Sequence, residues 1–524
     1  MFNSTKIMFK PYICNETLIF PPCIGDLVPR DSAARLVSDI VEQLDLRSVI
    51  HTYSSSSDGQ PPYHPVMLTK VVLYGYMNNI FSSRGLEQAI CRDVHMLWLS
   101  SFQHPDHSTI HRFKGRCRDH IKDIFSQLVR ILVEKGEIQL SKELYIDGTT
   151  IRSRSARYNI RWRKNAERLA EKARTGLDEA LDQLLRQAEE ADLTEGVCTA
   201  SVERTPEDAR NIAAEIESRI AGDRRDKSTR SVRGSIKKVR EYAGRRDAHE
   251  DTLKGCRGRC GVSPTDPDCG IMHSKQDGHQ GRPTPNYNVQ IATQNQYVTN
   301  YDVFDCPDDK SNLLEFVDTC TEENAVKPQA VVADAGYGSE EVYVGLEERG
   351  IEAVVKYMYY DRDCARQRRP AKERVFDSTS FRLDEKGEGL LCPAGHQLQV
   401  KKTETVVNRS GFSSEMTYFT YDGCSGCPFA RQCVVSRGTY RDVKRKLGAM
   451  RMERKARQRL AEPINQQRIK RRSLEPEPVF GQLKHNHGYT RFRHFSRPRV
   501  RMDLGFELMA LNLLKYHKNQ KKVG

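Results

Sequence analysis

The chain has 524 residues, 38% of them hydrophobic and 29% charged, and its formal net charge is +14. This length accommodates two or three domains. It contains no apolar run of about 18 residues, and charged and polar residues interrupt positions 1–29, which argues against a membrane-spanning helix and a signal peptide. We therefore expect a cytoplasmic protein with a polyanionic partner.

Residues 1–140 are expected to form a helical N-terminal domain. Apolar residues recur at helical spacing from about Ser32 to Gly136. Pro105-Asp-His-Ser-Thr109 supplies helix-start residues, and the next turn carries His111, Arg112, Lys114 and Arg116. A turn before a basic helix is compatible with a helix-turn-helix that binds DNA ends, and equally with an ordinary helical bundle.

Residues 141–157 are expected to begin the catalytic core, with a strand from about Glu143 to Ile151 that carries Asp147. The composition then changes. Residues 158–255 are dominated by Glu, Arg, Lys, Ala and Leu, which predicts a charged helical hairpin or short coiled coil inserted into the core. This insertion is either a solvated arm or a helical contact for dimerisation or DNA.

The core is expected to continue through residues 256–360. Tyr287–Thr293 and Tyr297–Val303 flank a short polar turn and predict a β-hairpin. The following elements are predicted as a helix, a strand, a helix and a strand, at about 312–324, 329–334, 339–349 and 351–356, which is the order of a mixed sheet. Asp147 and Asp334 each close an apolar run shortly before a glycine, so we expect both to project from strand ends.

Residues 361–440 are predicted to form a second, cysteine-containing insertion. A Cys-x-x-Cys pair with two outlying thiols predicts a structural Zn²⁺ site at Cys392, Cys424, Cys427 and Cys433. The alternative is a set of reduced, partly buried thiols, as expected for most of the 15 cysteines of a cytosolic chain.

Residues 441–516 are predicted to hold a basic segment and the last catalytic helices, and residues 517–524 a basic tail. The Lys- and Arg-rich stretch from Arg437 to Arg472 leads into a helix with Glu477 and Lys484. These two residues lie seven positions apart, which places them on one face of an α-helix. An apolar helix from about Val500 to Leu514 is expected to pack on the sheet.

Asp147, Asp334 and Glu477 are predicted to form one metal centre. Two carboxylates about 4 Å apart repel by about 4 kcal/mol at an effective dielectric of about 20, so a cluster needs a compensating cation. Mg²⁺ or Mn²⁺ binds carboxylates, water and phosphate oxygens, and two ions about 3.5 to 4 Å apart suit in-line phosphoryl displacement. Taken singly, each carboxylate is better explained as a solvated or helix-capping residue, and only their shared context favours a metal centre.

Together these segments resemble the bacterial insertion-sequence transposases of the DDE type, in the superfamily whose third motif is tyrosine-arginine-glutamate-lysine. The resemblance covers nearly the whole chain and rests on the order of Tyr63-His-Pro-Val-Met67, Pro105-Asp-His-Ser-Thr-Ile110, Asp147-Gly-Thr149, Tyr287-Asn-Val-Gln-Ile291, Asp334-Ala-Gly-Tyr337, the Cys424 knuckle and Pro478-Val-Phe-Gly-Gln-Leu-Lys484.

The resemblance implies an α/β protein with an RNase H-like mixed-sheet core, in which Asp147, Asp334 and Glu477 are catalytic and hold Mg²⁺. Lys484 matches the lysine of the third motif. The tyrosine is missing, since Lys470 stands near its place, and the arginine matches approximately at Arg471 or Arg472. Glu475 is the alternative third carboxylate, and its interval to Lys484 fits the motif less well than that of Glu477.

The implied activity is that of a transposase which binds the terminal inverted repeats of its element, cleaves the ends and joins 3′-hydroxyls to target DNA. We expect double-stranded DNA as partner, a homodimer assembled on it, and association with the bacterial nucleoid. Arg472, Lys484, Arg491 and Arg493 are expected to contact DNA phosphates. The alternatives are an RNase H-like nuclease without strand transfer, an inactive DNA-binding derivative, and a phosphatase of another fold.

Overall fold

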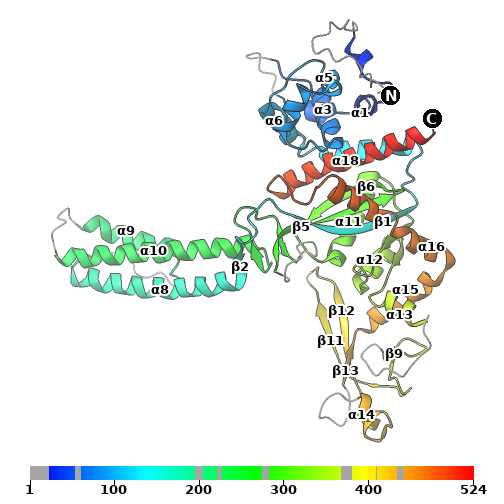
Figure 1. Ribbon diagram of the computed structural model, residues 1–524. Coiled ribbons are helices and arrows are strands. Elements are labelled where there is room, and N and C mark those ends of the chain that lie inside the picture. The colour runs from blue at the N-terminus through cyan, green and yellow to red at the C-terminus, as the bar shows by residue number, and fades with distance from the viewer. Residues whose placement is uncertain are drawn as a thin grey trace, which may run out of the picture. The chain divides into compact units, whose positions relative to one another are not determined.

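Figure 1 shows a computed structural model of the chain, which describes residues 23–53, 61–194, 204–220, 227–273, 282–367, 380–408, 410–433 and 442–523. The chain divides into two compact units, one formed by Met1–His120 with Met509–Gly524 and the other by Ile121–Leu508. Among the described residues, no helix combines the length and apolar content needed to cross a membrane.

The described part of the first unit is helical, but the unit ends at His120, so α7 (Ile121–Glu134), expected in the helical domain of residues 1–140, falls in the second unit. Its elements are η1 (Ile24–Leu27), α1 (Ala33–Val41), α2 (Arg47–Ile50), α3 (Pro65–Met77), α4 (Ser83–Ile90), α5 (Val94–Leu99), α6 (His107–Cys117) and the end of α18 (Arg497–Val523). Asp106 caps α6 by accepting a 2.7 Å hydrogen bond from the Thr109 amide. Lys114, expected on the basic face of this helix, is instead buried, and its ammonium donates to the Tyr76 hydroxyl.

A mixed six-stranded sheet forms the centre of the second unit. Its strands are β1 (Glu143–Arg152), β4 (Gly270–Met272), β5 (Thr284–Gln294), β6 (Tyr297–Phe304), β7 (Ala330–Ala333) and β8 (Glu352–Val355). β5 pairs antiparallel with β1, β4 and β6, whereas β1, β7 and β8 run parallel. Asn295 and Gln296 form the predicted hairpin turn with φ of 51° and 61°, the left-handed conformation of tight hairpins.

Successive residues of β1 point to opposite faces of the sheet, and they contribute to a different hydrophobic core on each face. Leu144 and Ile146 pack with α11 (Asp309–Asn324) and α12 (Glu340–Glu348), through residues such as Phe316 and Leu346. Tyr145 lies in the other core, with Tyr357, Tyr360 from α13 (Tyr360–Gln367), and Leu460 from α15 (Leu447–Ala461). Asp147 shares the orientation of Tyr145. On its side, α15 is followed by α16 (Pro463–Arg472) and α17 (Pro476–Gly481).

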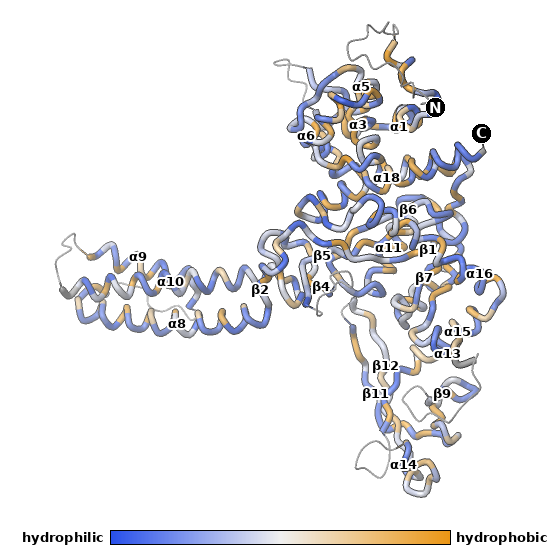
Figure 2. Tube along the Cα trace, in the orientation of Figure 1, coloured by the Kyte–Doolittle hydropathy of each residue, from blue (hydrophilic) through white to orange (hydrophobic). Residues whose placement is uncertain are grey.

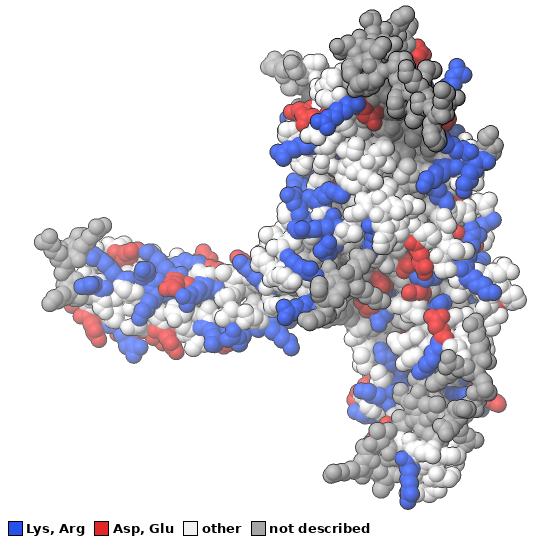
Figure 3. All heavy atoms as spheres, viewed as in Figure 1, with Lys and Arg blue, Asp and Glu red and all other residues white. Residues whose placement is uncertain are grey.

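The charged insertion is a three-helix arm rather than the predicted hairpin. α8 (Arg163–Glu190), α9 (Pro206–Arg219) and α10 (Lys227–Cys256) run alongside one another and share a buried core (Figure 1). Apolar positions recur at intervals along otherwise hydrophilic helices (Figure 2), and α9 adds its own stripe of Ala209, Ile212 and Ile216. Outside this core, side chains of both signs alternate over the surface (Figure 3).

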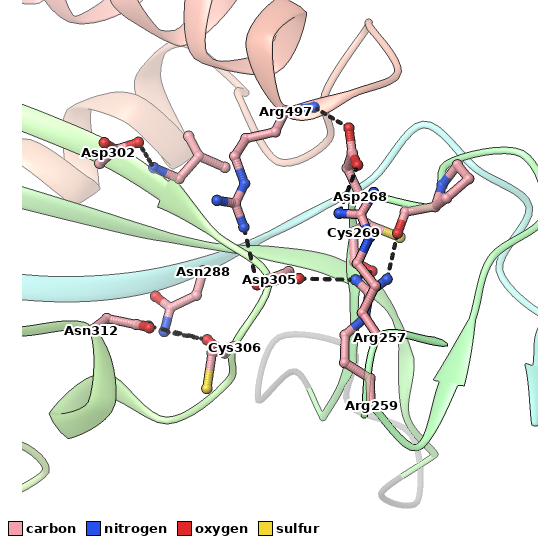
Figure 4. Close-up of polar contacts among 12 residues, drawn as sticks. Arg257, Arg259, Asp268, Cys269, Asn288, Asp302, Asp305, Cys306, Asn312 and Arg497 are labelled. Atoms are coloured by element: carbon pink, nitrogen blue, oxygen red, sulfur yellow. Dashed lines mark hydrogen bonds and ion pairs between the residues drawn. The ribbon is translucent and has the colours of Figure 1, made fainter. Parts of the chain in front are cut away.

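A network of arginines and aspartates fastens the base of this arm (Figure 4). The Arg259 guanidinium donates to the carbonyls of Gly255, Pro267 and Cys269 and pairs with Asp305 at 3.1 Å. The other oxygen of Asp305 pairs with Arg497 at 3.0 Å. The end of α10, the end of β6 and the start of α18 are thereby joined.

The cysteine-containing insertion forms a small β-structure of its own. A two-stranded sheet consists of β9 (Arg382–Leu383) and β10 (Leu390–Leu391), and a three-stranded sheet of β11 (Gln399–Val407), β12 (Ser413–Thr420) and β13 (Val443–Arg445). Its core contains Phe381, Leu398 and Phe419.

The close approach of β4 to the Asp305 network predicts that Gly270→Ala destabilises the protein. An added Cβ would lie 2.0 Å from the Asp305 carbonyl oxygen, which only backbone movement relieves. We expect the unfolding free energy from urea titration to fall by about 1–3 kcal/mol. Gly481→Ala in α17 is the control, because nothing lies within 4 Å of its added Cβ. Equal stability of both variants would contradict the packing described.

Candidate active site

Asp147 and Asp334 lie on neighbouring parallel strands. Tyr145 pairs with Val332, and each aspartate follows two residues later in its own strand direction. Asp334 directly follows β7, as predicted. Asp147 does not end its strand, because β1 continues to Arg152 through its pairing with β5. The pairing of β1 with β7 ends at Tyr145, so it does not extend to Asp147.

Three carboxylates from distant segments meet around Arg472, the last residue of α16. The Arg472 Nη2 atom lies 3.0 Å from Asp147 Oδ2 and 3.6 Å from Asp334 Oδ2. Nη1 of the same guanidinium lies 3.7 Å from Glu477 Oε1. The Arg472 and Asp147 side chains are only 11% and 17% exposed, so the contact between them is shielded from solvent and weakly screened.

The two candidates for the third carboxylate differ in their surroundings. Glu475 is buried, accepts a 2.7 Å hydrogen bond from the Gln296 amide and pairs with Arg471 at 2.9 Å. Glu477 is 58% exposed and faces Arg472 together with the two aspartates. The geometry therefore groups Glu477, and not Glu475, with Asp147 and Asp334.

A buried polar cluster supports the Asp147 end of the site, and sequence reasoning did not identify it. Asp309 Oδ1 accepts hydrogen bonds from Asn288 (2.7 Å) and Gln290 (2.8 Å), and the Tyr337 hydroxyl donates to Gln290. Gly148 fits against it because a Cβ there would lie 2.3 Å from Gln290 Nε2. The alternation of Asn288 and Gln290 along a buried strand was the available signal.

Burial shapes the protonation of these carboxylates. It raises the pKa of Asp147 to about 6, which the Arg472 guanidinium opposes and the Asp334 carboxylate reinforces. Burial likewise raises the pKa of Asp309, against the hydrogen bonds from Asn288 and Gln290. One guanidinium thus leaves the negative charge of this pocket incompletely compensated.

Two family models match separate parts of the chain. Residues 391–517 match the family described as "Transposase DDE domain", and residues 22–116 match "Transposase domain (DUF772)". The two matches indicate an insertion-sequence transposase of the DDE type. No curated protein and no solved structure matched it. The first match contains Arg472, Glu477 and Lys484 of the transposase site, and the second lies within the helical unit.

The donor chemistry of the transposase site suits a divalent metal, and DDE domains generally use one. Carboxylate oxygens are the ligands that Mg²⁺ and Mn²⁺ prefer, and these three already surround a cation. The oxygens are nevertheless spread around a guanidinium. Among the described residues, no group of three or more His, Cys, Asp or Glu is arranged to hold a metal.

Lys484 approaches the same strand from a π-helix. Residues Gln482–Asn486 continue α17 with π-helical geometry, in place of the regular α-helix predicted through Glu477 and Lys484. The Lys484 ammonium donates to the Thr149 hydroxyl (2.5 Å) and the Thr150 carbonyl (3.2 Å). Burial lowers the pKa of Lys484 to about 8, although the Asp147 carboxylate opposes this shift.

Arg491 and Arg493, predicted to contact DNA, are engaged within the transposase. Arg491 donates to the carbonyls of Ser153, Arg154 and Ser155. Arg493 lies over the Tyr489 ring and 4.0 Å from the buried Asp503 carboxylate. Their DNA contacts stay a prediction, and their described contacts fix the segment that follows Lys484.

The cysteines predicted to bind zinc line one cavity of the transposase. Cys392, Cys424, Cys427 and Cys433 surround it together with His396 and aromatic side chains, and all four are free thiols. In the described part of the chain, however, no such group has a metal-binding arrangement. Zinc binding therefore stays a prediction from the sequence.

The depressed pKa of Lys484 predicts a pH-dependent stability difference between the transposase and its Lys484→Met variant. Between pH 8 and about 10.5, folded Lys484 releases a proton that the unfolded chain retains. In this window the unfolding free energy of the native chain should therefore rise relative to that of the variant, by at most about 3 kcal/mol. Below pH 8 the difference between the two unfolding free energies should not change with pH. Urea titrations of both proteins measure the difference, and a constant offset up to pH 10.5 would contradict a buried, charged Lys484.

Proposed function

We propose that Asp147, Asp334 and Glu477 form the catalytic metal centre of this transposase. The observation that carries the proposal is their convergence on one buried cation, although they come from β1, the end of β7 and α17. Repulsion between the carboxylates destabilises such a cluster unless a cation is present. A divalent metal would supply that cation and would also bind the phosphate oxygens of DNA. The proposed reaction is cleavage at the terminal inverted repeats, followed by joining of the 3′-hydroxyls to target DNA.

The protein side of this reaction follows from the placement of each residue. Asp147 and Asp334 sit on a rigid sheet and would fix the position of the centre, whereas the more exposed Glu477 can adjust to the bound DNA. When bound, Mg²⁺ or Mn²⁺ would activate the attacking water or hydroxyl and stabilise the leaving oxygen. The Lys484 ammonium, held beside Thr149, would position a phosphate near Asp147.

The sheet supports the proposal of an RNase H-like core. The order β6-β5-β1-β7-β8, with antiparallel β5 and β6 and parallel β1, β7 and β8, places Asp147 on the central strand. A carboxylate on the middle strand and another after its parallel neighbour form a centre open at one edge of the sheet.

Double-stranded DNA is the partner that we propose, bound by a dimer assembled on the transposon ends. The net charge of +14 and the excess of Lys and Arg through α15 and α16 support a polyanion. DNA-end recognition by the helical unit agrees with its transposase-domain match, but rests on no contact in the structure.

A nuclease that cuts without joining would use the same carboxylates. Pre-cut inverted-repeat ends bearing 3′-hydroxyls distinguish the two activities. Insertion of these ends into a plasmid in the presence of Mg²⁺ supports the transposase reaction, whereas cutting of uncut ends without insertion supports the nuclease.

The proposed centre predicts that Asp147→Asn, Asp334→Asn and Glu477→Gln each reduce cleavage of inverted-repeat DNA by more than about 100-fold. DNA binding by fluorescence anisotropy should change little, because the fold and the basic surface remain. Glu475→Gln is the matched control: it weakens the contacts to Arg471 and Gln296, so it should lower stability but retain cleavage. Full cleavage by Asp334→Asn, or loss confined to Glu475→Gln, would contradict the assignment.

A further inference from the structure

We propose that Arg472 is a positioning residue that gathers the three carboxylates in the metal-free transposase and competes with the metal for them. This inference rests on the proposed function, because it assumes that the same carboxylates bind the metal. It goes beyond the DNA contact predicted for Arg472 from the sequence.

A single planar group spans the whole centre. Arg472 Nη2 lies between Asp147 and Asp334, and Nη1 reaches Glu477. The nitrogen-to-oxygen distances of 3.0 to 3.7 Å are far longer than the metal-to-oxygen distance of about 2.1 Å in Mg²⁺ sites. A metal held by all three carboxylates would have to replace these guanidinium contacts.

Arg472 differs from its neighbours in having these carboxylates as its ion-pair partners. Arg471 pairs with Glu475 and donates to Asn295, and Arg468 pairs with Glu352. The Nε atom of Arg472 is buried and has no hydrogen-bond partner among the described residues. Ion pairs hold the side chain, and Nε makes no hydrogen bond with the described residues. Moving the guanidinium away from the carboxylates therefore breaks no hydrogen bond at Nε.

The charge of the cluster favours replacement of the guanidinium by a divalent metal. Three carboxylates face Arg472, and Lys484 adds a second positive charge that interacts with Asp147, so the cluster still carries an excess of negative charge that a divalent ion would neutralise. A guanidinium and a divalent ion at the same oxygens repel each other, which favours exchange over joint binding. In the metal-free protein, the positive charge of the same guanidinium offsets the repulsion between the carboxylates.

Calorimetric titration of the metal-free full-length protein with Mn²⁺ tests the competition. Arg472→Gln removes the competing charge and should bind Mn²⁺ about 10-fold more tightly than the native chain. Arg472→Lys keeps the charge but not the two-nitrogen fork, so its Mn²⁺ affinity should lie between those of the native chain and Arg472→Gln. Lys470→Gln removes an exposed charge from the same helix, away from the carboxylates, and should leave the affinity nearly unchanged.

Thermal unfolding supplies a second measurement. In EDTA, Arg472→Gln should unfold at a lower temperature than Lys470→Gln, because three carboxylates lose their cation. Mn²⁺ should raise its melting temperature by more than it raises that of the native chain, since binding to the folded state stabilises by mass action.

The native chain itself gives a test that depends on no variant. Modification of Arg472 by an arginine-selective dicarbonyl, followed by mass spectrometry, should be slow without metal because the side chain is 11% exposed. It should accelerate when Mn²⁺ displaces the guanidinium. Unchanged modification at saturating Mn²⁺, or equal or weaker Mn²⁺ binding by Arg472→Gln, would overturn the inference.

The double variant Asp147→Asn/Asp334→Asn separates this inference from the proposed function. If Mn²⁺ binding requires these aspartates but is indifferent to Arg472, only the role of Arg472 fails. If Mn²⁺ binds equally well without the aspartates, the proposed metal centre itself fails.

Discussion

Charge compensation among Asp147, Asp334 and Glu477 is the interaction on which the site depends. Carboxylates brought close together repel one another, and the fold nevertheless directs three of them to one guanidinium. Arg472 makes the arrangement tolerable by contacting all three. Burial raises the pKa of Asp147 to about 6, and the neighbouring Asp334 carboxylate adds to this shift while Arg472 opposes it.

The packing of α16 and α17 explains how distant residues reach this point. Glu475 binds the Gln296 amide and Arg471, Gln296 donates to the Leu474 carbonyl, and Arg471 donates to Asn295. These contacts clamp the α16–α17 junction to the β5–β6 turn. Arg472 and Glu477 on either side of the junction then face the sheet. Glu475 therefore has a structural role that accounts for an acidic residue so close to the candidate ligand.

Much of the sheet was predictable because strands and turns depend on local patterns. The apolar runs predicted the strands with Asp147 and Asp334, and the polar turn predicted the β5–β6 hairpin. Family motifs also led to Glu477. The π-helix at Lys484 and the third arm helix were missed, because both depend on packing between segments. Long-range contacts also decide that Arg472 faces carboxylates, that Lys114 is buried and that Asp309 joins Asn288 and Gln290.

Crystals of the full-length transposase grown with Mn²⁺ provide the most direct test of the metal centre. An anomalous difference map should contain a peak bounded by Asp147, Asp334 and Glu477, with the Arg472 guanidinium withdrawn from their oxygens. A peak at other residues, or three carboxylates more than about 10 Å apart at saturating Mn²⁺, would contradict a shared centre.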